Sequence, residues 1–576
     1  MRISMTRRAV AAVATAGLLL VAVPAAVTPA NAADACAAGA TCEGNLTGTL
    51  GTSPFKIVMP TTFNGTVLMY NHGYRFKDPI PAAFAGPTAL GLSTNPAYTA
   101  ISVPAFAPAF GSAVAYQANN MAQVASNDTI AQQLLAQGYA LAGVGNSSQG
   151  WAISEGIQAN ENLIKHVNGG AIAGVKKILM WGDSFGGFMS ATVAERNPSK
   201  VAGIMPLCAP LAGPEQAMNS AMTVMYTWKT LIAPTLRVAN YQSYTQALSD
   251  LGTVLTTLGA VAAGTASTSA VGYPIAQANL LGGLMAGLPT KSSVYDGQTV
   301  NPAFATLGTA AALAGGYSPA SAGASSAAAM LQNVGAAAAL GIMVRYDLET
   351  KARGLASIPA TDSANFTDNV NVAYTALLSS EQRGEFGDTL NATTVMPNAL
   401  NAMLAKLDES KGNPAARFAV NAAAVKAIRS LPAPKGVYTV PTVLMTTTYD
   451  PVVPAANTEN YYLKLMASAK KMGVMGKALQ FYTIPPEDGW TTFDAGAKSP
   501  NSAASAAKAT SGVGHCNWTI GNGVQVVNGI TALNRLVAAK SAKQIKAINR
   551  LMWATPGVNS DGAFVPEPLK RPALAK

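Results

Sequence analysis

Gly182-Asp-Ser-Phe-Gly186 is the most informative segment of this chain. An apolar run of strand type, 177–181, leads into it, and a helix-like run, 188–196, follows and stops before Pro198. The pentad alone is weak evidence, because the chain contains 53 glycines. A Gly-x-Ser-x-Gly pentad between a strand and a helix, however, is the pattern of a nucleophile elbow. Its glycines leave no Cβ to clash where the backbone bends, so Ser184 is a candidate nucleophile.

The first 32 residues are predicted to be a secretory signal peptide, absent from the mature chain. They carry three arginines at the start, an apolar stretch over 9–27 and a small-residue cleavage site at 30–32. A membrane anchor is the alternative, but prolines at 24 and 29 interrupt the stretch and no charged stop follows. No other window is long and apolar enough to span a bilayer. We therefore expect a secreted, soluble protein without a membrane span.

Composition excludes some classes of protein. Charged residues make up 11% of the chain and hydrophobic residues 49%, which is typical of a folded core and not of a disordered polyelectrolyte. The formal net charge of +11 falls to +8 without the three arginines of residues 1–32. No basic block interleaves with aromatic residues, so we expect no nucleic-acid partner. The surplus charge suits solubility or attraction to an acidic surface.

Four cysteines remain after export, and an even count in an oxidising compartment favours two disulfides. Cys36 and Cys42 are close in sequence and could staple the mature N-terminus. Cys208 and Cys516 would then pair over a long separation. No Cys-x-x-Cys or His-x-x-x-His spacing occurs, so we expect no metal site, and nothing implies a cofactor.

Alternating strand and helix patterns predict an α/β fold with a mostly parallel central sheet, flanked by helices on both faces. The expected strands are short apolar runs, and helical stretches lie between several of them. The strands are 55–73, 139–145, 176–182, 201–207, 441–447 and 478–484, and the helical stretches include 128–137, 156–167 and 458–471.

A large helical segment interrupts this alternation. Residues 211–434 are rich in Ala, Gly, Ser and Met, with helical runs at 217–230, 244–258 and 326–348. These runs carry enough apolar surface to need a partner, which favours a packed cap or lid over a low-complexity spacer. The expected organisation is a core of 33–210 and 435–552, the cap of 211–434 between its two parts, and an extended tail of 553–576.

A serine nucleophile needs a base, and the chain has only three histidines. His166 lies in a helical run and is expected to be a packed or exposed helix residue. His515 lies in a loop flanked by glycines, after the last predicted strand and before the final helix. Its alternative is a structural role, but the loop position favours the base. His72 follows an early strand and belongs to another part of the site.

The base in turn needs an acid that fixes its tautomer and stabilises the imidazolium. Asp450 follows a strand-like run and precedes Pro451-Val-Val-Pro454, a rigid turn. A helix cap or turn residue is the alternative for Asp450. Asp347 and Asp368 lie in the helical segment, with no strand edge to place them, and rank lower.

Acyl transfer develops an oxyanion, which needs preorganised N–H donors. The N–H of Phe185, directly after the nucleophile, is expected to be one donor. The N–H of Tyr74 is the candidate for the second, with His72 and Gly73 shaping the turn after strand 66–70.

The chain order Ser184, Asp450, His515 completes the pattern, and with it the chain resembles the α/β-hydrolase superfamily. The resemblance rests on the elbow, on His72-Gly73 after an early strand, and on Asp450 and His515. It covers roughly 44–208 and 435–550, and it implies that the helical segment is a cap inserted after the sixth strand. A single His-Gly is most similar to secreted bacterial serine hydrolases, and not to the His-Gly-Gly-Gly branch.

His515-Cys516 also resembles, more weakly, the tannase and feruloyl-esterase group. In that group a cysteine beside the catalytic histidine is bridged to one beside the nucleophile. Here Asp183 precedes Ser184, so that bridge cannot form, and Cys208 is the substitute that the resemblance suggests. A Cys208–Cys516 bond would tie the histidine loop to the sheet.

These features predict a secreted serine hydrolase that cleaves carboxylic esters through an acyl-enzyme. The cap suggests an apolar or bulky substrate, such as an acyl ester, an aromatic ester or a polyester oligomer. One alternative is an exported peptidase of the aminopeptidase type, in which Glu349 and Glu381 would grip a substrate ammonium. The other is a cell-surface binding protein on a scaffold that has lost its activity. The oligomeric state cannot be predicted.

Overall fold

The computed structural model describes most of the chain, with gaps. The described residues are 35–81, 98–99, 102–107, 111–118, 120–262, 266–288, 326–391, 396–447, 450–483, 515–516, 523–555, 558 and 565–571. The predicted signal peptide, residues 1–32, lies outside them. Among the helices of these segments, none is long and apolar enough to cross a membrane.

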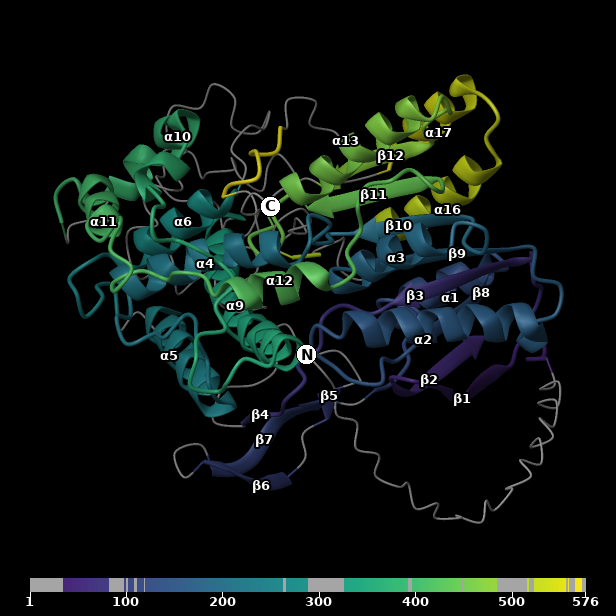
Figure 1. Ribbon diagram of the computed structural model, residues 1–576. Helices are drawn as coiled ribbons and strands as arrows, with labels where there is room; N and C mark the ends of the chain where they lie inside the picture. The colour runs from purple at the N-terminus through teal and green to yellow at the C-terminus, as the bar shows by residue number, and fades with distance from the viewer. Residues whose placement is uncertain are drawn as a thin grey trace, which may run out of the picture.

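An eight-stranded sheet forms the centre of the molecule (Figure 1). Its order is β1-β2-β8-β3-β9-β10-β11-β12. β2 pairs antiparallel with β1 and β8, and the remaining pairs are parallel. The mostly parallel α/β sheet predicted from the sequence is confirmed. The strands are β1 Thr41–Gly48, β2 Gly51–Val58, β3 Thr66–Asn71, β8 Ala140–Val144, β9 Lys177–Asp183, β10 Gly203–Leu207, β11 Thr442–Thr447 and β12 Ala478–Thr483.

The predicted strand 55–73 is wrong as a single element. The structure divides it into the end of β2, a connection, and β3, because the two strands flank β8 on opposite sides. Pro60 and Gly65, whose φ is 90°, lie in the connection. β1 was not predicted, because its residues alternate between exposed and half-buried and form no apolar run.

Helices cover both faces of the sheet, since successive side chains of each strand point to opposite faces. Met180 of β9 packs with the helices of one face, whereas Trp181 packs with those of the other. The first face carries α2 Ile153–His166, which continues into the π-helical turn η2 Val167–Ala171, and also α3 Phe185–Arg196 and α13 Ala456–Lys471. The second face carries α1 Asp128–Ala136, α16 Val524–Ala538 and α17 Ala542–Trp553 (Figure 1).

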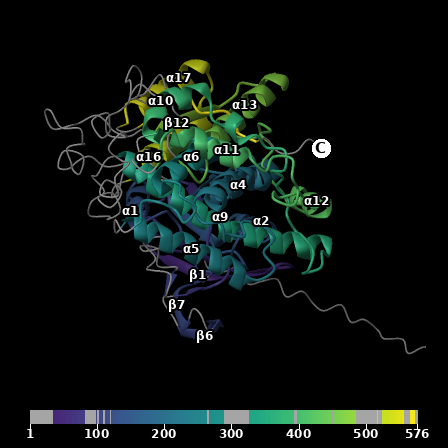
Figure 2. The same cartoon turned by 90° about the vertical axis from the view of Figure 1, so that its left-hand side faces the viewer.

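Between β10 and β11 the chain forms a group of helices, called the inserted helices below. They have a hydrophobic cluster of their own, which includes Trp228, Leu281 and Met403. Figure 2 views the molecule from the side of these helices. The helical runs predicted at 217–230, 244–258 and 326–348 all lie in helices. The members are α4 Pro214–Leu231, α5 Tyr244–Ala262, α6 Ile275–Ala286, α9 Ser326–Ala356, the 3₁₀ turn η4 Tyr374–Leu377, α10 Ser380–Asn391, α11 Ala399–Asp408 and α12 Ala422–Ser430.

Two further parts complete the fold. A small antiparallel sheet that was not predicted joins β4 Ile80–Pro81, β5 Tyr98–Thr99, β6 Ser102–Ala107 and β7 Gly111–Ala118. Of the predicted tail, 553–576, the described residues are 553–555, 558 and 565–571. Trp553 still belongs to α17, and residues 565–571 lie against α4, where Gln216 Nε2 donates to the Lys570 carbonyl at 3.0 Å.

Candidate active site

The elbow at Ser184 lies at the carboxyl end of β9, between β3 and β10 in the sheet. Ser184 separates β9 from α3 and has φ 56° and ψ −120°, a conformation that residues with a Cβ rarely adopt. Its N–H donates to the Leu207 carbonyl at the end of β10, at 2.8 Å. Strained backbone of this kind is held in place by its surroundings and is concentrated at functional sites. The strand–turn–helix context predicted from the sequence is confirmed.

The two glycines of the pentad are required by the end of β3. A Cβ added to Gly186 would lie 1.9 Å from the Asn71 carbonyl oxygen, and one added to Gly182 would lie 2.3 Å from the same atom. No real Cβ approaches backbone so closely. The sharp turn and the tight packing against β3 therefore both demand glycine.

His515 lies between the nucleophile candidate and the acid candidate. Its Nε2 is 2.7 Å from Ser184 Oγ, and its Nδ1 is 2.7 Å from Asp450 Oδ2. An ionised carboxylate only accepts hydrogen bonds, which assigns the ring proton to Nδ1. Nε2 then presents its lone pair to the Ser184 hydroxyl. This arrangement can remove a proton from the serine.

Asp450 is fully buried and is held by backbone as well as by His515. Its Oδ1 accepts from the N–H groups of Val452 and Val453, each at 2.9 Å. These bonds leave Oδ2 directed at the imidazole. The turn after β11, predicted from Pro451-Val-Val-Pro454, therefore fixes the carboxylate.

Two disulfides are present, Cys36–Cys42 and Cys208–Cys516, in the pairing that the sequence suggested. Cys208 directly follows β10 and is fully buried, with its N–H bonded to the Met445 carbonyl of β11 at 2.8 Å. Cys516 is the direct neighbour of His515. The bond therefore joins the histidine segment to the middle of the sheet. His515 precedes α16, which is not the final helix, because α17 follows.

The residues expected to hold the oxyanion lie beside Ser184. A Cβ added to Gly73 would be 3.8 Å from Ser184 Cβ and 3.5 Å from the Asp183 carbonyl oxygen. The segment 72–74 thus runs past the nucleophile. Phe185 is the first residue of α3, so its N–H has no acceptor within the helix and lies at the positive end of the helix dipole.

The other two histidines are not bases for Ser184. His72 is buried and donates from Nδ1 to the Gly73 carbonyl at 2.7 Å. Burial, reinforced by the charge of Arg75, lowers the pKa of His72 to about 3, so the ring is neutral at physiological pH. His166 is the last residue of α2, with its ring 4.6 Å from that of Phe55.

A narrow apolar cavity of about 50 Å³ opens beside Ser184. The inserted helices form one wall, through residues of α4 and α9. Tyr74, Trp151 and the turn after Asp450 form the other. The lining residues from these two helices include Met218 and Ala221 of α4, and Ala337, Leu340, Gly341 and Val344 of α9. The inserted helices therefore shape the space that a substrate would occupy.

Sequence reasoning ranked Asp347 low, yet the structure brings it to the site. Its carboxylate accepts a hydrogen bond from the Tyr74 hydroxyl, across 273 positions of sequence. Burial raises the pKa of Asp347 to about 7. The helical spacing of α9 predicts which face of the helix Asp347 lies on, but no sequence signal predicts that its partner is Tyr74. Trp151 was also missed; its ring lies 5.4 Å from that of Phe185 and lines the cavity.

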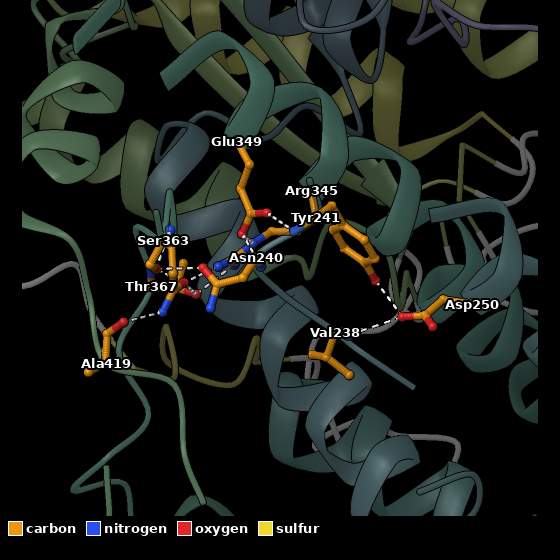
Figure 3. A network of polar contacts seen from close by, with 10 residues as sticks. Val238, Asn240, Tyr241, Asp250, Arg345, Glu349, Ser363, Thr367 and Ala419 are labelled. Atoms are coloured by element: carbon orange, nitrogen blue, oxygen red, sulfur yellow. Dashed lines mark hydrogen bonds and ion pairs between the residues drawn. The ribbon is translucent and has the colours of Figure 1, made fainter. Parts of the chain in front are cut away.

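Glu349 has a different environment from the one considered for a peptidase. Its side chain is fully buried, paired with Arg345 Nε at 2.7 Å, and it accepts from the N–H groups of Asn240 and Tyr241 (Figure 3). It is not among the residues that line the cavity at Ser184. Glu381 is exposed on α10. The carboxylate of Glu349 is therefore occupied inside the inserted helices and does not face a substrate.

Among the described residues, one group of His, Cys, Asp and Glu side chains is close enough to hold a metal ion, namely Cys208, His515 and Cys516. Its two sulfurs are joined in the disulfide and offer no thiolate.

Comparison with known proteins gives one family and several structures. A family model described as serine aminopeptidase, S33, matches residues 124–259. No curated protein matches the chain. An esterase from Aspergillus oryzae is similar at 12% identity over 86% of this chain and 80% of its own, with a TM-score of 0.36.

Two further structures match shorter parts of the chain. An α/β serine hydrolase without a lid from Xanthomonas campestris matches at 11% identity over 31% of this chain and 65% of its own, with a TM-score of 0.20. An arylesterase matches at 15% identity over 31% of this chain, with a TM-score of 0.17. The match spans about half of the arylesterase, 48% of its length.

Proposed function

The chain belongs to the α/β-hydrolase superfamily, and we propose that it is a serine hydrolase that cleaves carboxylic esters through an acyl-enzyme on Ser184. One observation carries the proposal. His515 lies within hydrogen-bonding distance of both Ser184 and Asp450, at 2.7 Å to each, and Ser184 lies half-buried on the elbow beside the cavity. This is the order and spacing of a nucleophile, a base and an orienting acid.

In the first step the Ser184 oxygen attacks the ester carbonyl, and its proton passes to His515 Nε2. The imidazolium that forms is stabilised by the buried carboxylate of Asp450. The carbonyl oxygen becomes an oxyanion, which accepts from the N–H groups of Phe185 and Tyr74. Collapse of this intermediate expels the alcohol, which takes the proton from His515, and leaves the acyl group on Ser184.

In the second step His515 removes a proton from a water molecule, which attacks the acyl carbonyl. The oxyanion is again held by the two N–H groups, and Ser184 leaves with the proton from His515. The acid is released and the enzyme returns to its starting state. The nucleophile, the base, the acid and the two oxyanion donors all belong to the chain.

The cavity favours a substrate with an apolar part. Its walls beside Ser184 are aliphatic or aromatic, and it is bordered by the small side chain of Ala221 on α4 and by Gly341 of α9, which has no side chain. Burying a methylene in such a site contributes about 0.8 kcal/mol. A narrow, apolar cavity suits a straight acyl or alkyl chain better than a branched polar group.

A peptidase is the second candidate, because the matching family model describes serine aminopeptidases. The feature that would favour it in this chain is an acidic grip for a substrate ammonium. Glu349 does not supply one, since both of its oxygens bond to Arg345, Asn240 and Tyr241.

The experiment compares two substrate classes on one protein. Wild type and Ser184→Ala are assayed with p-nitrophenyl acyl esters of two to twelve carbons and with aminoacyl-p-nitroanilides. We expect ester hydrolysis by wild type, lost in Ser184→Ala, with kcat/KM rising from two to about four carbons, because a cavity of about 50 Å³ accommodates only about two more methylene groups. Activity confined to the anilides would assign the peptidase instead.

Secretion is also proposed. The sequence pattern of residues 1–32 supports it, and so do the two disulfides, because structural disulfides persist mainly in oxidising compartments. N-terminal sequencing of the protein from culture medium should begin at Ala33. A protein found only inside cells, with Met1 retained, would contradict this.

A further inference from the structure

One face of α9 connects the cavity wall with the nucleophile's surroundings. Ala337, Gly341 and Val344 line the cavity beside Ser184, and they recur at the spacing of a single helical face. Asp347 continues the same face one turn further. Its carboxylate accepts the hydrogen bond from the Tyr74 hydroxyl. An apolar wall and a polar anchor therefore belong to one helix surface.

Tyr74 is fixed at both of its ends. Its backbone follows Gly73, whose added Cβ would lie 3.8 Å from Ser184 Cβ. Its ring lines the cavity and meets Phe76 edge-on at 5.6 Å. Its hydroxyl reaches α9. Any change at Asp347 would therefore be passed to the backbone that runs past the nucleophile.

The space around Asp347 is shaped for this contact. A Cβ added to Gly150, whose φ is +80°, would lie 2.7 Å from Asp347 Oδ2. One turn beyond, Lys351 Nζ donates to the Trp151 carbonyl and pairs with Glu155 Oε2, each at 3.1 Å. Trp151 lines the cavity opposite α9. The helix thus has two polar anchors on residues that border the site.

A second cavity, of about 220 Å³, lies on the other side of Asp347. This cavity is lined by polar residues and is large enough for several water molecules. The Asp347 carboxyl group can therefore exchange protons with solvent. The charged groups that face Asp347 are Lys77 and Asp78 from the loop after β3, and Lys351 from α9 itself. Glu155 of α2 lies in the same cavity.

We propose that Asp347 is a positioning residue of the hydrolase, which holds Tyr74 and so aligns the second oxyanion donor beside Ser184. The inference rests on the proposed function and deepens it. Asp347 touches neither the substrate nor the reacting atoms, and it acts through the Tyr74 hydroxyl. The helix that forms the cavity wall would thereby also set the geometry of the transition-state site.

The test uses three variants, Tyr74→Phe, Asp347→Ala and Asp347→Asn, in the full-length exported protein. The control is Tyr241→Phe, which removes a buried tyrosine–aspartate bond of the same type, Tyr241 to Asp250 at 2.7 Å, away from the cavity (Figure 3). Each protein is assayed for kcat and KM with p-nitrophenyl butyrate. The rate of labelling by a fluorophosphonate and the thermal midpoint are also measured.

We expect Tyr74→Phe and Asp347→Ala to lower kcat and the labelling rate by roughly 10- to 100-fold, with KM within about threefold. The double variant should be no slower than either single variant, because both remove one contact. Asp347→Asn keeps an oxygen acceptor for Tyr74 and should recover most of kcat. Tyr241→Phe should lower the thermal midpoint and leave kcat unchanged.

A pH profile provides the readout that a structural role would not move. Because Asp347 has a pKa of about 7, its stronger, ionised acceptor form grows between pH 6 and 8. The ratio of kcat for wild type over Asp347→Asn should therefore rise across this range, since the two proteins differ only at position 347.

Wild-type kcat in Tyr74→Phe and Asp347→Ala would overturn the inference. Losses of kcat that are fully explained by a lower thermal midpoint would overturn it as well. A wild-type protein that neither hydrolyses esters nor takes the probe would overturn the proposed function together with it.

Discussion

Removing the Cys208–Cys516 disulfide should reduce both stability and catalysis, whereas removing Cys36–Cys42 should reduce stability alone. The first bond closes a loop of 308 residues and the second a loop of 6. Chain entropy then gives ~6 kcal/mol for the long loop and ~2 kcal/mol for the short one. The difference arises in the unfolded chain, because a longer loop loses more conformations when it is closed.

The effect on catalysis has a separate cause. Cys516 adjoins His515, and its partner Cys208 is anchored to β11 through the Met445 carbonyl. Without the bond, the contacts that the described residues give to the imidazole are those with Asp450 and Ser184. Misplacement of a catalytic group by about 1 Å can cost roughly a hundredfold in rate.

The assay compares Cys208→Ala/Cys516→Ala with Cys36→Ala/Cys42→Ala, so that no free thiol remains in either variant. Denaturant unfolding gives the stability of each, and p-nitrophenyl butyrate gives kcat. We expect kcat to fall by roughly 10- to 100-fold in the first variant and to stay within twofold of wild type in the second. Equal kcat in both variants would refute the role assigned to the bond.

Three further predictions concern single residues. Burial lowers the pKa of His72 from 6.5 to about 3, so its contribution to stability is complete above pH 6.5 and is lost as pH falls toward 3; between pH 7 and 4.5 wild type should lose about 3 kcal/mol more than His72→Asn in urea unfolding. Gly341→Leu should fill the cavity, because even a Cβ there meets Ala221 Cβ at 3.3 Å; kcat/KM for butyryl esters should fall about tenfold more than for acetyl esters, and equal losses would contradict an acyl-binding role of the cavity. Glu349→Gln leaves the buried charge of Arg345 unpaired and should cost about 3–5 kcal/mol in denaturant unfolding; a loss below about 1 kcal/mol would show that the pair is not needed.

Local patterns made the centre of the fold predictable. The elbow could be recognised because a buried strand, two glycines and a helix lie within 20 residues of sequence. β9, β10 and β11 are continuous apolar runs because both faces of the sheet are covered, and such runs stand out. The order of Ser184, Asp450 and His515 also suggested one site before any distance was known.

Elements without an apolar run were missed. β1 alternates between exposed and half-buried residues. In the small sheet, β4 and β5 have two residues each, and β6 and β7 contain few large apolar residues. The sequence of 55–73 predicts one strand, because the turn signal at Pro60 and Gly65 is weaker than the hydrophobic pattern around it.

Partners far apart in sequence could not be predicted. Tyr74 and Asp347 are 273 positions apart, and only the tertiary fold brings them together. The buried pair of Arg345 and Glu349 has the spacing of an ordinary exposed helical pair. Its burial, and the hydrogen bonds from the N–H groups of Asn240 and Tyr241 to Glu349, could therefore not be predicted. Pairing across the fold, and not residue type, decides these roles.

The atom of the protein that becomes phosphonylated identifies the nucleophile. A fluorophosphonate probe, followed by peptide mass spectrometry, would locate the adduct on wild type, Ser184→Ala, His515→Ala and Asp450→Asn. We expect one adduct on Ser184 in wild type, none in Ser184→Ala, and labelling slowed by at least a hundredfold in His515→Ala. A folded wild-type protein that takes no label, or takes it on another residue, would contradict the proposed nucleophile.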